Sequence, residues 1–228
     1  MTTPRPAPAA TATLLALAAL TYSAWTLEAF LGTGLPPART YVSELAATNQ
    51  PYTTLFRTTD LLAGTLVCAA VAAAAATLSA RRIPRTARAA LLLFGAATAV
   101  DSRLPLSCTP TTDPECAARE TAALVPWTHS AHTVSSTVAL CGILVAMATL
   151  TRTARMGPAL LALELAATAW TLAAIAALET GHDGWGVGIA QRLQVGVIAI
   201  WLGALAVSLL HAPEPAARGA LRAANVRP

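Results

Sequence analysis

The chain has 228 residues, of which 55% are hydrophobic and 11% are charged, and its formal net charge is +4. Soluble domains usually carry about 25% charged residues, so the composition argues against a soluble domain and predicts a membrane protein. The positive charge does not indicate a nucleic-acid partner. All the basic residues are arginines, and they stand in short clusters between apolar segments, which is typical of the loops of a multi-pass membrane protein.

Six apolar runs predict an all-α fold, a bundle of six transmembrane helices in one polytopic domain. The predicted spans cover residues 9–31, 51–80, 89–105, 126–151, 158–178 and 187–211, each near the length that crosses a bilayer. No convincing cleavage site follows the first run, so we expect it to be retained as a span. A Pro-rich tail at 1–8, which we expect to be disordered, and a tail at 212–228 flank the domain.

The arginines also predict the orientation of the bundle. Residues 81–88 contain four arginines, and cytoplasmic loops are enriched in basic residues, so this loop is expected in the cytoplasm. With six spans, both termini then lie in the cytoplasm too. This arrangement places ten of the fifteen arginines inside, namely Arg5, Arg81, Arg82, Arg85, Arg88, Arg152, Arg155, Arg218, Arg222 and Arg227.

Two of the loops on the other side carry candidate features. Residues 43–47 are expected to form a short helix at the interface, where Ser43 before Glu44 is a candidate nucleophile, although an N-cap is the more common role. Cys108 and Cys116 share the long polar loop 106–125, and their spacing permits a disulfide in an oxidising compartment. The alternative is two free thiols.

Ionisable residues from five spans fall at similar depth in the outer leaflet, about 6 to 10 Å inside the ends of their spans at 1.5 Å per residue. They are Glu28, Asp60, Asp101, His132 and Arg192. Arg57 and His129 lie about one helical turn shallower. Unpaired charges at this depth cost about 2.5 to 3.5 kcal/mol each, so pairing is expected. Arg57 and Asp60 share a helix face, and Arg192 is placed to meet Glu28 or Asp101.

The polar layer has two interpretations. In the first, it forms a cavity open to the outside, with Glu28, Asp60, Asp101, His129 and His132 as catalytic groups. Arg57, Arg192, Ser43 and Glu44 would then bind the substrate. A divalent metal held by His129, His132 and Asp101 is an option, although a two-residue gap between histidines is more often a capping or hydrogen-bonding arrangement. In the second interpretation, the layer is a salt-bridge network that fixes the registry of the helices.

Three short segments resemble one known family. They are YVSELAATNQPYTTLFRTTDLLAG at 41–64, DSRLP at 101–105 followed by two histidines, and GWGVGIAQRLQVGVIAIW at 184–201. Together they resemble the bacterial membrane family catalogued as domain of unknown function 998.

The resemblance implies a membrane protein of six to seven helices, a bacterial plasma-membrane location and no established activity. It also implies site residues at the matching positions, which are Ser43, Glu44, Arg57, Asp60, Asp101, His129 or His132, and Arg192. The chain departs from the family pattern at Gln191, where an acid is expected, and in its longer cysteine-containing loop.

The first functional hypothesis is a membrane-embedded enzyme, namely a hydrolase, transferase or cyclase. It would act on a lipid, lipid-linked or isoprenoid-like substrate by acid–base or metal-assisted chemistry. The alternative is a non-catalytic membrane sensor or assembly protein whose charge network is structural. A transporter is the third hypothesis, and the lack of evident repeats or broken helices argues against it.

Overall fold

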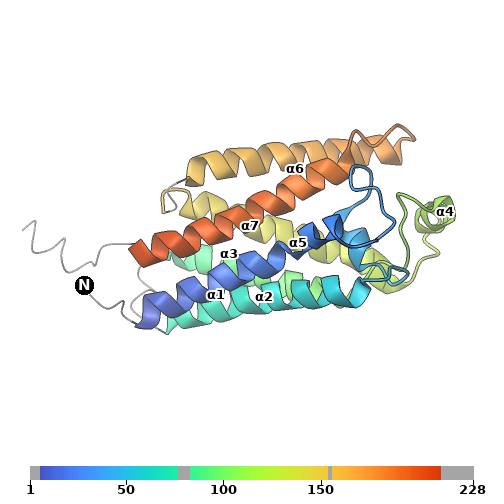
Figure 1. Cartoon of the computed structure of the whole chain (residues 1–228). Coiled ribbons are helices and arrows are strands. Elements are labelled where there is room, and N and C mark those ends of the chain that lie inside the picture. The colour runs from blue at the N-terminus through green and yellow to red at the C-terminus, as the bar shows by residue number, and fades with distance from the viewer. Residues whose placement is uncertain (1–5, 77–82, 154–155, 212–228) are drawn as a thin grey trace, which may run out of the picture.

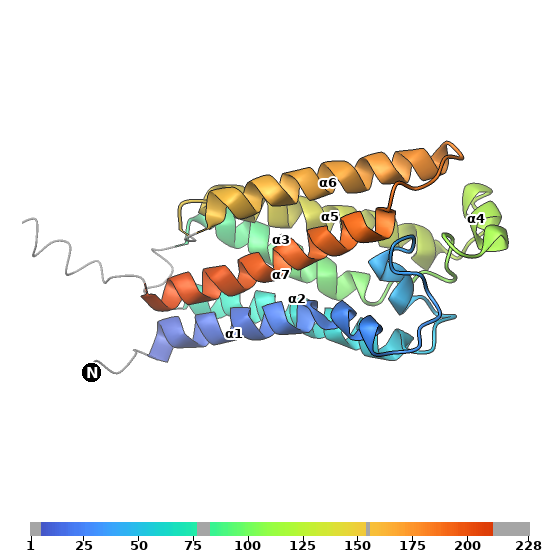
Figure 2. The same cartoon turned by 45° about the horizontal axis from the view of Figure 1, so that its top comes forward.

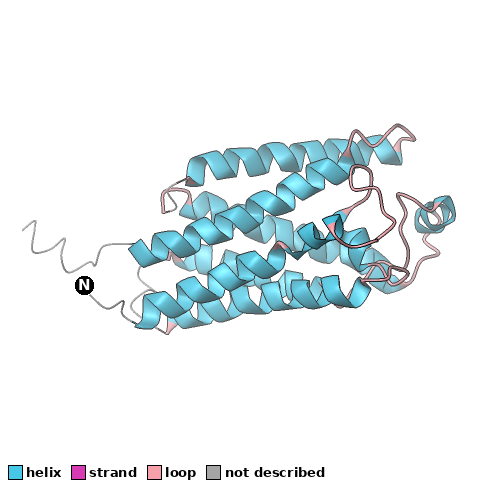
Figure 3. Cartoon of the chain, viewed as in Figure 1, coloured by secondary structure: helices cyan, strands magenta, loops and turns pink. Residues whose placement is uncertain are grey.

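The computed structural model describes residues 6–76, 83–153 and 156–211, and this part of the chain folds into helices and loops without a strand (Figure 3). The long helices are α1 (Pro6–Tyr22), α2 (Thr53–Ala75), α3 (Arg85–Asp101), α5 (Trp127–Leu150), α6 (Gly157–Glu179) and α7 (Val187–His211). The short ones are α4 (Pro114–Thr121) and two 3₁₀ helices, η1 (Ala24–Ala29) and η2 (Val42–Ala46).

The six long helices lie side by side, and α4 lies beyond one end of them (Figures 1 and 2). We call this the disulfide end; residues 23–52, 102–126 and 180–186 connect the helices there. Around the bundle the order is α6, α7, α1, α2, α3 and α5, each packed closely on the next. The remaining pair of neighbours, α5 and α6, contact each other only lightly. The ring is therefore loosest between α5 and α6.

Among the residues that the structure describes, five segments are long and apolar enough to cross a membrane, which confirms a helical membrane protein. They are Ala9–Ala29, Thr53–Ala75, Trp127–Leu150, Gly157–Glu179 and Val187–His211. The third predicted span is different, because α3 has only 17 residues. That corresponds to about 26 Å of helix, against about 30 Å for the hydrocarbon core.

The bounds of α3 differ from the predicted 89–105. The helix begins at Arg85, directly after Pro84, and ends at Asp101. Leu104 precedes Pro105, and a residue before proline is disfavoured in the α conformation, so the helix stops short of it. Asp101 is therefore the last helical residue, and the chain after it is loop.

The first span is also not one continuous α-helix. The α-helix ends at Tyr22, and 3₁₀ helix η1 continues it. Two hydroxyls near the break bond to the backbone: Thr21 Oγ1 donates to Leu17 O and Ala18 O, and Ser23 Oγ donates to Ala19 O. Such local bonds compete with the helical ladder, which gives a physical reason for the change of helix type here.

The core of the bundle is apolar, and small residues let its helices approach closely. Trp201, Phe94 and Ile143 are fully buried at its centre, and the Tyr22 ring packs edge-on against Phe94, with 5.6 Å between centroids. On α2, a Cβ added to Gly64 would lie only 2.4 Å from the carbonyl oxygen of Gly95 on α3. Small residues at such crossings are typical of membrane bundles.

The long polar loop at the disulfide end is an ordered cap. The structure contains the predicted disulfide between Cys108 and Cys116, and the second cysteine lies in α4, a helix that the sequence did not lead us to expect. Asp113 caps α4 by accepting hydrogen bonds from the backbone nitrogens of Glu115 and Cys116. The disulfide therefore ties the helix back to the loop before it.

Removing this disulfide by the double change Cys108→Ser and Cys116→Ser is expected to loosen the cap. Disulfides typically contribute about 2 kcal/mol or more, so local opening should rise about 30-fold or more. Arg119 on α4 is half exposed, so trypsin cleavage after Arg119 measures that opening. The matched control changes the free thiols Cys68 and Cys141, and it should cleave as the wild type does. Equal cleavage of both variants would contradict the prediction.

Candidate functional site

A cavity of about 390 Å³ opens at the disulfide end of the bundle. Residues of η1, η2, α2, α3, α5, α6 and α7 line it, so it lies between most of the helices and not on one face. Its ionisable lining residues are Tyr22, Tyr41, Arg57, Asp60, Asp101, Glu120, His132 and Glu179. Apolar side chains continue the cavity toward the core, among them Leu140, Ile143 and Ile198.

Asp101 and His132 meet in this cavity. His132 Nδ1 lies 3.0 Å from Asp101 Oδ1. Two hydroxyls of α5 hold the same carboxylate: Ser135 Oγ donates to Asp101 Oδ1, and Ser136 Oγ donates to Oδ2 at 3.1 Å. The last residue of α3 is thereby fixed against α5, with an imidazole beside it.

Asp60 on α2 lines the same cavity and accepts no hydrogen bond in the part of the chain that the structure describes. It lies close enough to Asp101 and His132 for their charges to interact. The expected pair with Arg57 does not form, because Arg57 Nε donates to the backbone oxygen of Ser102 at 2.9 Å. That carbonyl directly follows the end of α3, where backbone oxygens lack helical partners.

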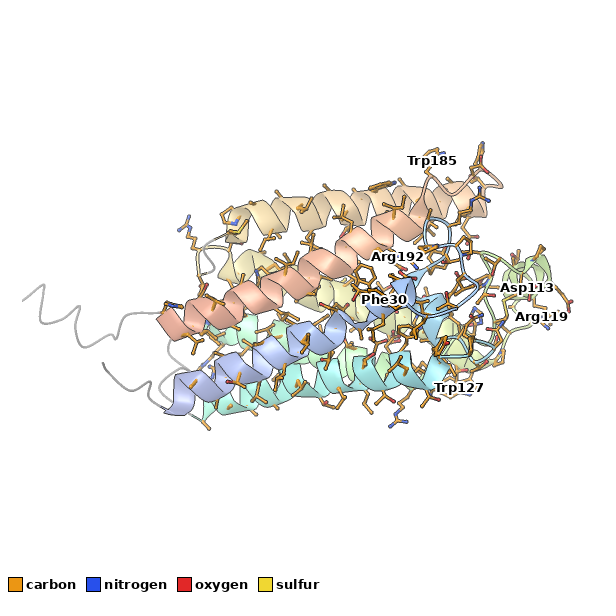
Figure 4. The ribbon with its side chains drawn as sticks, in the orientation of Figure 1. Phe30, Asp113, Arg119, Trp127, Trp185 and Arg192 are labelled. Carbon is orange, nitrogen blue, oxygen red and sulfur yellow. A yellow bond between two sulfur atoms is a disulfide. The ribbon has the colours of Figure 1, made fainter. Side chains whose placement is uncertain are left out.

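Glu28 and Arg192 form a buried ion pair away from this group. Arg192 Nε and Nη2 donate to the two Glu28 oxygens, each at 2.6 Å, and Nη1 donates to Thr40 O at 2.7 Å. The sequence offered Glu28 or Asp101 as the partner of Arg192, and the structure selects Glu28. Figure 4 shows Arg192 on α7, toward the disulfide end. This pair fastens η1 and the segment after it to α7.

Glu44 is buried in a structural role as well. Its carboxylate accepts hydrogen bonds from Tyr41 N at 2.9 Å, from Thr111 N at 2.8 Å and from Thr111 Oγ1 at 2.5 Å. Burial raises the pKa of Glu44, and these hydrogen bonds act in the opposite direction. Ser43, which lines the cavity, lies within η2 and is not its N-cap. Glu44 thus joins η2 to the disulfide loop.

His129 points away from Asp101. Its Nδ1 accepts a hydrogen bond from Ser107 N at 3.1 Å, and its Nε2 lies 3.4 Å from Glu120 Oε1. His129, His132 and Asp101 therefore do not converge on one point. His129 contacts Ser107 and Glu120, whereas His132 contacts Asp101 at the end of α3. Within the described residues, no three His, Cys, Asp or Glu side chains are grouped as a metal site requires.

Several residues of the site were not predicted as functional. Ser136 lies four residues after His132, and residues at this spacing are neighbours on the surface of a helix. This spacing could have indicated that the two side chains lie together. Gln191, where the family pattern favours an acid, accepts a hydrogen bond from Val42 N at 2.5 Å. Glu120 of α4 lines the cavity, and Thr111 donates hydrogen bonds to Glu44. No sequence pattern marks either residue.

The fold and the cavity define the class of protein: a helical membrane protein with an ionisable cavity at one end of its bundle. Residues 15–208 match the model of the family described as Protein of unknown function (DUF998). The match covers most of the chain, so the chain belongs to this family, and the resemblance seen in its motifs is confirmed. No curated protein and no solved structure matches the chain.

Proposed function

We propose that the protein is a membrane-embedded enzyme that takes a lipid or lipid-linked substrate into the cavity and acts on it by acid–base chemistry. The observation that carries the proposal is the position of Asp60, without a hydrogen-bond partner in the described structure, in one cavity with the Asp101–His132 pair. His132, oriented by Asp101, is the base. Asp60, in its protonated form, is the acid.

The form of the cavity favours a lipid substrate. It extends between α5 and α6, the neighbours with the lightest contact. Thr133 and Thr137 of α5 and Leu172 of α6 all line the cavity and are all exposed on the outside of the bundle. A substrate dissolved in the bilayer can enter by this side opening, with its polar part toward Asp60 and its apolar chain along Leu140 and Leu172.

We further propose six spans, with α3 as the short one, and both termini in the cytoplasm of a bacterium. Seven of the arginines behind that orientation lie outside the described residues, namely Arg5, Arg81, Arg82, Arg155, Arg218, Arg222 and Arg227. The disulfide gives independent support, since disulfides persist in oxidising compartments. Trp127 and Trp185 are exposed at the same end (Figure 4), as expected for anchors at the membrane interface.

A non-catalytic sensor or assembly protein is the second candidate. It is favoured by the buried contacts of Glu28 with Arg192 and of Glu44 with Thr111, which are structural in geometry. A purely structural role does not explain why Asp60, within the described part of the chain, lies without a hydrogen bond in a cavity lined by ionisable residues. The two candidate functions therefore differ in the role of Asp60, which is a catalytic acid in the first and part of a structural network in the second.

The test is conversion of lipid by the purified full chain in vesicles of phosphatidylglycerol and phosphatidylethanolamine supplemented with bacterial lipid extract. Mass spectrometry of the lipids before and after incubation measures the reaction. Asp60→Asn is expected to lower the rate about 100-fold or more, as the loss of an acid or base does. Its melting temperature should stay near that of the wild type, since no hydrogen bond is lost.

Arg103→Gln is the matched control for this experiment. Arg103 is exposed and is not among the residues lining the cavity, so this variant should keep the wild-type rate. Unchanged lipids with the folded wild-type protein would favour the non-catalytic candidate. A large loss of stability in Asp60→Asn would assign Asp60 to the structural network instead.

A further inference from the structure

His132 and Ser136 stand one turn apart on α5, and both line the cavity. His132 Nε2 lies 3.4 Å from Ser136 Oγ, while the other ring nitrogen, Nδ1, lies 3.0 Å from Asp101 Oδ1. A carboxylate, an imidazole and a hydroxyl are therefore arranged in series, with the imidazole in the middle. Activated serine nucleophiles are built in this order, and their hydrogen bonds are often long without substrate.

We propose that Ser136 is the nucleophile of an acyl-transfer reaction, with His132 as its base and Asp101 as the group that orients the base. The proposal rests on the enzymatic function proposed above and specifies its substrate class as a carboxylic ester of a lipid. Within this cavity, Ser136 is then the nucleophile, His132 the base and Asp60 the acid.

Asp101 is held in a way that suits this role. Ser135 Oγ donates to its Oδ1 and Ser136 Oγ donates to its Oδ2, so both oxygens are fixed from α5. A carboxylate beside Nδ1 favours the imidazole tautomer with its proton on that nitrogen, which leaves Nε2 free to accept. The Ser136 hydroxyl then needs only to rotate from Asp101 Oδ2 to His132 Nε2 before it reacts.

The reaction balances with the groups present. Ser136 Oγ bonds to the ester carbonyl carbon and its proton passes to His132 Nε2. The bond from that carbon to the alcohol oxygen breaks, and the oxygen takes the proton of Asp60. In the second step, water attacks the carbonyl carbon of the acyl-serine and gives a proton to Asp60. The bond between that carbon and Ser136 Oγ then breaks, and Oγ takes its proton back from His132. The sum is ester plus water giving acid plus alcohol.

The surroundings fit a lipid ester. Arg57, anchored to Ser102 O beside Asp101, brings positive charge to the cavity, where the carbonyl oxygen becomes negative. The lining of α5 becomes apolar past Ser136, with Ala139, Leu140 and Ile143, and α6 adds Leu172 and Ile175. An acyl chain has apolar walls on that side, and the alcohol part lies toward the ionisable residues.

The test is covalent labelling of the full chain in detergent with a fluorescent alkyl fluorophosphonate, a probe that reacts with activated serines. Peptide mass spectrometry should place the label on Ser136, and Ser136→Ala should abolish it. Asp101→Asn and His132→Gln should slow labelling about 1,000-fold, as changes within such a triad do. Thr149→Val, at an exposed position of α5 that does not line the cavity, is the matched control and should label like the wild type.

Each outcome decides the proposal, provided that the melting temperature shows a folded protein. Label on another residue, equal labelling of Ser136→Ala, or no label on the wild type overturns Ser136 as nucleophile. Lipid conversion that persists in Ser136→Ala but fails in Asp60→Asn overturns the nucleophile alone and leaves the acid–base function standing. Lipids unchanged by the folded wild type overturn the proposed function itself.

Discussion

Replacing Arg192 by glutamine is expected to lower the free energy of unfolding by about 3 to 5 kcal/mol, because it leaves the buried Glu28 carboxylate without its partner. Both side chains are at most one-tenth exposed, so water does not replace the lost hydrogen bonds. The carbonyl of Thr40 loses a donor as well. Tryptophan fluorescence during unfolding in mixed detergent micelles measures the change.

The double variant Glu28→Gln with Arg192→Gln is the informative companion. It removes both charges, so it should be more stable than Arg192→Gln alone, since no unpaired ion stays buried. Arg103→Gln, at an exposed position, should change stability by about 0.5 kcal/mol or less. An Arg192→Gln protein that unfolds like the wild type would show that the pair is not structural, and would return Arg192 to the candidates for substrate binding.

Replacing Gly64 by alanine is expected to destabilise the bundle by about 3 kcal/mol, the upper part of the range for overpacking. The added Cβ would stand 2.4 Å from Gly95 O and 2.6 Å from Ala99 N. Both are backbone atoms of α3, so a side-chain movement cannot relieve the contact, and α2 and α3 must separate. The same unfolding measurement applies.

Gly203→Ala on α7 is the control for this substitution, because its Cβ would meet only the Ala19 Cβ at 4.0 Å. Alanine favours a helix over glycine by about 1 kcal/mol, so this variant should be slightly stabilised. If Gly64→Ala were stabilised to the same extent, the close approach of α2 and α3 would not be part of the structure in the membrane.

The long helices could be predicted because each requires a sustained apolar run, and such runs survive in the sequence whatever surrounds them. Their ends were less predictable. Tyr22 ends α1 where two hydroxyls bond to the backbone, and Asp101 ends α3 four residues before Pro105. These limits depend on local hydrogen bonds, and a hydropathy pattern does not contain them. Helix α4 depends on the disulfide and the Asp113 cap within an otherwise polar loop.

The sequence predicted the depth of the ionisable residues better than it predicted their partners. Counting residues gives the depth of each residue along its helix, and this count placed Asp60, Asp101 and His132 at similar depth. In the structure, all three line one cavity. Partner choice depends on how each helix is rotated and on which loops fold over it. Arg57 therefore bonds to Ser102 instead of Asp60, and His129 bonds to the disulfide loop instead of Asp101.

The short α3 affects how the membrane's electric field acts on the site. Ser102, Pro105 and Leu106 follow its end and line the cavity, and backbone outside a helix is tolerated at membrane depth only against protein or water. Water in this cavity would conduct, so with the proposed six spans a membrane potential, worth about 2.3 kcal/mol per charge at 100 mV, would fall mainly across the rest of the bundle. In the proposed mechanism, protons exchanged between Asp60 and the cavity would therefore cross little of that field, so voltage would neither drive nor oppose them.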